Sequence, residues 1–202
     1  MVMTAPLSQN PAAMLWLVTI AALWWIAALI WLFRFPTAIP AWVVALGGLC
    51  VILPAWLALA FLHGLQPSGR FMVFLVMASV WAADMGAFFA GKQFGRVKLA
   101  PRVSPGKTWE GVAGGLLTAV LVATGLCVFF GADWKALLPV VVCTAIISVV
   151  GDLTVSMFKR NAGLKDSGSV FPGHGGVMDR LDSLAAAAPV FVLGLALSQF
   201  GQ

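Results

Sequence analysis

Long apolar segments alternate with short polar connections along most of the chain. A transmembrane helix needs roughly 20 mainly apolar residues to cross the hydrocarbon core. Stretches that meet this requirement, with ends uncertain by several residues, are 14–33, 41–62, 71–90, 112–131, 136–158 and 184–200. The pattern predicts an all-α, polytopic integral membrane protein with about six transmembrane helices. We expect one membrane-embedded domain over residues 1–202, with N-terminal spans in 1–70 and the catalytic region in 71–202.

Composition supports this class and excludes a soluble globule. Of 202 residues, 61% are hydrophobic and only 9% are charged, whereas soluble domains are about one quarter charged. Several of the nine tryptophans, including Trp31, Trp42 and Trp134, lie near span ends, where an amphipathic ring suits the membrane interface. The first thirteen residues contain no Lys or Arg, so the basic start of a signal peptide is missing and we expect the first span to be retained.

The distribution of basic residues predicts the orientation. Lys and Arg collect in the connection after the third span, 92–107, and in the one after the fifth, 159–180. Cytoplasmic loops carry the excess of these residues, so both connections, together with Arg34, are expected on the cytoplasmic face of the inner membrane. Arg70 and Lys135 then fall outside. Four of the seven acidic residues, Glu110, Asp166, Asp179 and Asp182, lie between the same pairs of spans as these basic residues, so the net charge of +5 does not indicate a nucleic-acid partner.

Two carboxylates lie where a membrane makes charge expensive. Asp84 and Asp152 fall near the cytoplasmic ends of the third and fifth spans, so each is expected to face a wet cavity or a cation. Asp152, Ser156 and Lys159 stand at i, i+4 and i+7, which places them on one helix face. The alternative is an aspartate that reaches the interface or pairs with a neighbouring helix.

The connection between the fifth and sixth spans is rich in groups that suit phosphate and metal chemistry. Asp179 and Asp182, at i and i+3 on a short helix, can present two carboxylates to one divalent cation, and hard oxygen ligands suit Mg²⁺. Glycines around His174 let backbone approach a ligand. The basic side chains that can neutralise phosphate oxygens are Lys159, Arg160 and Lys165. Singly, each feature has a plainer explanation as a turn or a topology determinant; together they predict a metal-nucleotide site.

From residue 156 to 182 the chain resembles the signature of the phosphatidate cytidylyltransferase family, with S, KR, KD, G, PGHGG, DR and D in that order. The resemblance extends to Gly151-Asp152-Leu153, to the stretch 104–111 and to Asp84. It implies an enzyme that joins CTP to phosphatidic acid at the cytoplasmic surface and forms CDP-diacylglycerol. It also implies Mg²⁺, with a second cation such as K⁺ as an open question, and leaves a homodimer open.

The resemblance further implies residue roles. Asp152, Asp179 and Asp182 would hold the catalytic metals, with Lys159 and Lys165 as further catalytic residues. The residues implied to bind the nucleotide or the phosphates are Asp84, Ser104, Lys107, Arg160, His174, Gly175, Gly176 and Arg180.

Three positions depart from the family pattern. Family members commonly have an acidic residue where this chain has Val155, and often Ser and Tyr where it has Met85 and Phe88. Val155 would either border the pocket or face packed helices. These departures leave open a paralogue without activity. Two further alternatives are a CTP-dependent lipid kinase, which would share the substrates, and a transporter that uses Asp84 and Asp152 as an ion path.

Overall fold

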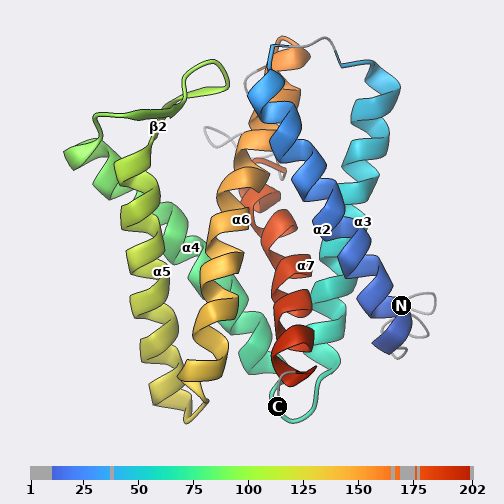
Figure 1. The fold of residues 1–202 in the computed structure, drawn as a ribbon, viewed down its shortest axis with the longest axis vertical. Coiled ribbons are helices and arrows are strands. Elements are labelled where there is room, and N and C mark those ends of the chain that lie inside the picture. Colours follow the sequence, from blue (N-terminus) through green and yellow to red (C-terminus); the bar gives the residue numbers. More distant parts are fainter. Residues whose placement is uncertain (1–10, 37–38, 165–166, 169–175, 177, 201–202) are drawn as a thin grey trace.

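The computed structural model describes residues 11–36, 39–164, 167–168, 176 and 178–200 (Figure 1). Its elements are α2 (Pro11–Arg34), α3 (Ala41–Gly64), α4 (Gly69–Phe94), β1 (Lys98–Ala100), β2 (Ser104–Thr108), α5 (Trp109–Phe130), α6 (Trp134–Asn161) and α7 (Met178–Phe200). Within the described residues, six helices are long and apolar enough to cross a membrane. The prediction of a helical, multi-pass integral membrane protein is confirmed.

The helices run up and down the bundle, which gives it two distinct ends (Figure 1). The hairpin of β1 and β2, the connection between α2 and α3, and the C-terminal end of α6 lie at one end. The connections between α3 and α4 and between α5 and α6 lie at the other. The hairpin and the end of α6 belong to the two basic connections of the sequence, and they share one end of the bundle as predicted.

Helix α7 lies at the centre of the bundle, where it contacts α2, α3, α4 and α6. Phe191 of α7 is fully buried, in one cluster with Leu62 of α3, Leu75 of α4 and Val141 of α6. By contrast, only 22% of the most apolar stretch of α5 is buried inside the protein, against 61% of that of α7. The C-terminal helix thus forms the core, and α5 stands at the edge against α4.

Small residues let α4 and α5 approach closely. A Cβ atom added at Gly115 of α5 would lie 2.5 Å from the carbonyl oxygen of Ala83 on α4. The hydroxyl of Thr118 donates a hydrogen bond across the interface to the carbonyl of Ala82, at 2.8 Å. Interhelical bonds of this kind and small residues at the contact are typical of membrane helix pairs.

A short antiparallel hairpin links α4 to α5 and was not predicted. Lys98 pairs with Thr108, and Ala100 pairs with Ser104. The hairpin continues into α5 without a break, since the Thr108 side chain caps this helix by accepting a hydrogen bond from the Gly111 amide at 3.1 Å. β2 is therefore held directly above the start of α5, where Thr108 is buried, Ser104 and Lys107 are partly buried, and Pro105 and Gly106 are exposed.

Candidate active site

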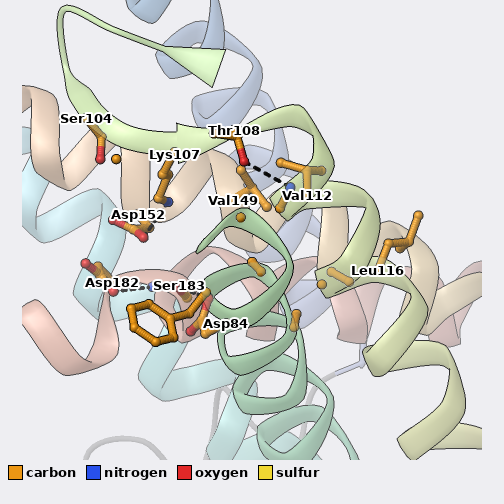
Figure 2. Close-up of a pocket in the computed structure, with 18 of the residues that line it drawn as sticks. Asp84, Ser104, Lys107, Thr108, Val112, Leu116, Val149, Asp152, Asp182 and Ser183 are labelled. Atoms are coloured by element: carbon orange, nitrogen blue, oxygen red, sulfur yellow. Dashed lines mark hydrogen bonds and ion pairs between the residues drawn. The ribbon is translucent and has the colours of Figure 1, made fainter. Parts of the chain in front are cut away.

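A cavity of about 590 Å³ lies beneath the hairpin, lined by residues of α4, β2, α5, α6 and the start of α7 (Figure 2). The polar and charged side chains that line it include Asp84, Lys92, Ser104, Lys107, Thr108, Asp152, Lys159, Asp182 and Ser183. These polar side chains come from α4, β2, α6 and α7, which are distant from one another in the sequence.

An ion pair joins the hairpin to α6 at this cavity. The Lys107 ammonium contacts the Asp152 carboxylate, and each side chain is about one quarter exposed, at 26% and 27%. Figure 2 shows the two side chains facing one another. Ser156, one turn further along α6, donates its hydroxyl to the other oxygen of Asp152 at 3.3 Å. Lys159 also lines the cavity, so the predicted face of Asp152, Ser156 and Lys159 does lead into it.

The first turns of α7 bring a second carboxylate and a hydroxyl to the cavity. Asp182 is 8% exposed and accepts a hydrogen bond from the Ser183 amide at 2.8 Å. The Ser183 hydroxyl donates to Asp84 of α4 at 3.3 Å, and Figure 2 shows these three residues below the ion pair. Asp84 itself is accessible to solvent in the cavity. Ser183 was missed by the sequence reasoning, because only the packing of α7 against α4 identifies its partner.

The charges of this cluster are coupled. Asp84 and Asp182 each interact electrostatically with Asp152 and with Lys107, and Asp182 interacts with Lys159 as well. Like charges held close together destabilise one another unless cations neutralise them. Two lysines provide part of that neutralisation, and the site is suited to a further cation.

The donor set fits Mg²⁺, although the described residues contain no group of three acidic, His or Cys side chains placed to hold a metal ion. Mg²⁺ is commonly bound by one or two carboxylates together with water and substrate phosphates. Asp152 and Asp182 supply two hard oxygen donors on one cavity. The third predicted ligand, Asp179, lies in the first turn of α7, and its side chain is outside the described part.

The remaining predicted residues are placed as follows. Arg160 is not among the residues that line the cavity; it donates to two backbone carbonyls, of Val103 and Leu164, each at 3.4 Å. Gly176 is buried, and a Cβ atom there would lie 2.9 Å from the backbone carbonyl carbon of Ser167, so a larger residue would require the backbone to shift. Predictions that fall outside the described residues or side chains concern Lys165, His174, Gly175 and Arg180.

The three departures from the family pattern lie in different surroundings. Val155 is 6% exposed and is absent from the cavity lining, which agrees with the packing alternative. Phe88 lines the cavity. Met85 faces outward, at 62% exposure, in an apolar groove between α4 and α5.

The structure is that of a multi-pass membrane protein whose candidate site, a cavity lined by carboxylates and lysines, lies toward one end of the helix bundle. The sequence model of the cytidylyltransferase family matches residues 1–198. The chain belongs to this family.

Curated relatives named phosphatidate cytidylyltransferase are similar to the chain. The protein of Pseudomonas aeruginosa is 46% identical over 179 residues, covering 85% of this chain and 66% of the relative. The protein of Haemophilus influenzae is 42% identical over 187 residues, covering 85% and 65%. That of Brucella suis is 46% identical over 145 residues, covering 68% and 51%. The chain thus spans between half and two thirds of the length of these relatives.

Proposed function

We propose that the protein transfers the cytidylyl group of CTP to phosphatidic acid, forming CDP-diacylglycerol and pyrophosphate. A phosphate oxygen of phosphatidic acid attacks the α-phosphorus of CTP, and the bond from that phosphorus to the pyrophosphate oxygen breaks. The observation that carries the proposal is the cavity, in which Lys107, Asp152 and Asp182 meet at one end of a membrane bundle.

The cavity has a polar part and an apolar part, as a reaction between a nucleotide and a lipid requires. Ser104 and Lys107 of the hairpin stand at the upper end in Figure 2. Apolar side chains, among them Leu116 of α5 and Ile146 of α6, also line the cavity. Ile146 precedes Asp152 by six residues, roughly 9 Å along a helix, and is 51% exposed. A lipid phosphate can therefore reach the carboxylates while its acyl chains stay among apolar groups.

The side chains act by binding and by electrostatics. Lys107 and Lys159 neutralise phosphate oxygens of the two substrates, and Asp152 and Asp182 would hold Mg²⁺. When bound, this cation offsets the negative charge that develops on the phosphates. Ser156 and Ser183 hold the carboxylates of Asp152 and Asp84 in place. Positioning and preorganised charge then supply the acceleration, and no covalent enzyme intermediate is required.

The proposed orientation places the hairpin end of the bundle in the cytoplasm of a bacterial cell, with the protein in the inner membrane. The C-terminal end of α2, the hairpin and the end of α6 gather at that end (Figure 1), and loops rich in Lys and Arg are retained on the cytoplasmic side. CTP then reaches the cavity from the aqueous side, and phosphatidic acid reaches it from the bilayer.

Labelled CTP tests the proposal against a CTP-dependent lipid kinase. The purified full chain is incubated with phosphatidic acid, Mg²⁺ and CTP that carries ³²P at either the α or the γ position. We expect only the α label to enter the lipid fraction, as CDP-diacylglycerol, with Asp152→Asn as the inactive control. Entry of the γ label alone would establish the kinase, and entry of neither label would refute nucleotide transfer to this lipid.

A further inference from the structure

We propose that Val103 is a positioning residue, assisted by Arg160, which fixes the hairpin on the end of α6 so that Lys107 is held against Asp152. The inference deepens the proposed function, because Lys107 is the group through which Val103 acts. It assigns a role to the turn of the hairpin, between β1 and β2, which lies outside the cavity.

The hairpin needs support from outside itself. It consists of a three-residue strand and a five-residue strand, with a register shift between Lys98 and Ala100. An isolated two-stranded hairpin is marginally stable in water. Thr108, directly after Lys107, is buried and fixes one end of β2 on α5. Gly106, on the other side of Lys107, has nothing within 4 Å of its Cβ position, so the turn end of the hairpin needs a contact of its own.

Val103 supplies the missing contact. It is 3% exposed, although it lies in a turn at the end of the bundle. Its side chain belongs to a hydrophobic cluster with Leu153 and Met157 of α6 and Ile39 of the connection between α2 and α3. The same α6 segment carries Asp152, so Val103 joins the hairpin to the helix that bears the partner of Lys107.

Arg160 reinforces this junction from the polar side. Its Nε donates to the Val103 carbonyl, and one terminal nitrogen donates to the Leu164 carbonyl, each at 3.4 Å. One planar guanidinium therefore bridges the hairpin turn and the residues that follow α6. A lysine, with a single nitrogen, does not reproduce the planar fork. The adjacent Asn161 forms two hydrogen bonds with the Ile39 backbone, at 3.1 and 3.0 Å. These bonds hold Ile39 in the hydrophobic cluster that contains Val103.

Only three residues separate Val103 from Lys107, so a hairpin turn that moves away from α6 displaces the ammonium as well. Ser104, which also lines the cavity, directly follows Val103. The buried valine thus sets the position of two cavity residues at once, without contact to a substrate.

Limited proteolysis tests the anchoring without reference to any substrate. Trypsin is added to the detergent-purified full chain, and cleavage after Arg102 is followed by mass spectrometry. Val103→Ala and Arg160→Gln are expected to accelerate this cleavage about ten-fold, since cleavage follows the open population of a segment. Val141→Ala removes the same atoms from a buried valine in the core of the bundle and should leave the rate at Arg102 unchanged. Equal rates in Val103→Ala and Val141→Ala would overturn the anchoring.

A double-mutant cycle tests whether Val103 acts through Lys107. The dissociation constant for CTP is measured in wild type, Val103→Ala, Lys107→Gln and the double variant. We expect Val103→Ala to weaken binding in the wild-type background and to have no further effect beside Lys107→Gln, because coupled residues are not additive. Val103→Ile should restore wild-type affinity. An equal loss in both backgrounds would overturn the positioning role. Absence of CTP binding by the wild type would refute the proposed function alone, since the trypsin result stands independently.

Discussion

Substitution of Gly151 should separate the two carboxylates of the cavity. Gly151 precedes Asp152 on α6 and faces α7 at the level of Asp182. A Cβ atom at position 151 would lie 2.6 Å from the Ala186 Cβ and 2.7 Å from the Asp182 carbonyl oxygen. The first of these contacts is roughly 1 Å closer than the ~3.5–4.0 Å at which carbon atoms pack. Gly151→Ala therefore forces α6 and α7 apart where they carry the site.

The substitution is expected to reduce catalysis strongly while the protein stays folded. Overpacking of a tight contact costs about 1–3 kcal/mol, which the rest of the α6–α7 interface can absorb. A displacement of about 1 Å at a catalytic group can reduce turnover about 100-fold. Gly151→Ala should accordingly remain folded, with a melting temperature in detergent lowered by several degrees, and lose most of the proposed cytidylyl transfer.

Two matched variants make the measurement decisive. Gly125→Ala changes a helical glycine of α5 that has nothing within 4 Å of its Cβ position, and it should retain wild-type turnover. Ala186→Gly, combined with Gly151→Ala, removes one of the two clashes and should restore part of the activity. If Gly151→Ala and Gly125→Ala have the same turnover, then the close approach of α6 and α7 does not set the geometry of the site.

Three further predictions concern the metal, the orientation and the departure at position 155. Asp152→Asn and Asp182→Asn should each abolish turnover with the melting temperature retained, because Mg²⁺ loses one of few protein ligands; wild-type turnover at limiting Mg²⁺ would assign these carboxylates a structural role. A cysteine at the exposed Gly106 should react with an impermeant thiol reagent only after the cells are permeabilised, and labelling of intact cells would reverse the orientation. Val155→Glu should lower the melting temperature without lowering the Mg²⁺ concentration for half-maximal activity, since a buried unpaired carboxylate is costly; a lower requirement for Mg²⁺ would place this residue at the pocket.

The spans could be predicted from the sequence because length and apolarity are local properties, but their ends depend on hydrogen bonds that hydropathy does not detect. α5 begins at Trp109 rather than 112, since Thr108 caps the helix. α6 begins at Trp134, where the Asp133 side chain accepts a hydrogen bond from the Lys135 amide. At its other end α6 continues past the apolar stretch to Asn161, because a helix continues wherever its backbone bonds are satisfied, in lipid or in water.

Contacts of the site within one helix could be predicted from the sequence, whereas contacts between helices could not. Ser156 could be matched with Asp152 because four positions on a helix define a neighbour. The contact of Lys107 with Asp152 and the hydrogen bond from Ser183 to Asp84, which spans 99 positions, depend on how separate helices pack. The hairpin was missed because Ser-Pro-Gly-Lys-Thr has no alternation of apolar and polar residues that would indicate a strand; its pairing is imposed by α4 and α5 on either side.

The placement of Ser183 has a consequence for how the protein is made. Asp84 enters the membrane with α4, early in synthesis, and an ionised side chain in a span is costly. Its hydrogen-bond partner belongs to α7, which is synthesised after α4, α5 and α6. Before α7 packs, the cavity lacks Asp182 and Ser183, which line it in the folded protein. The proposed site therefore forms only after α7 has packed against α4, and until then the Asp84 carboxylate lacks its hydrogen bond from Ser183.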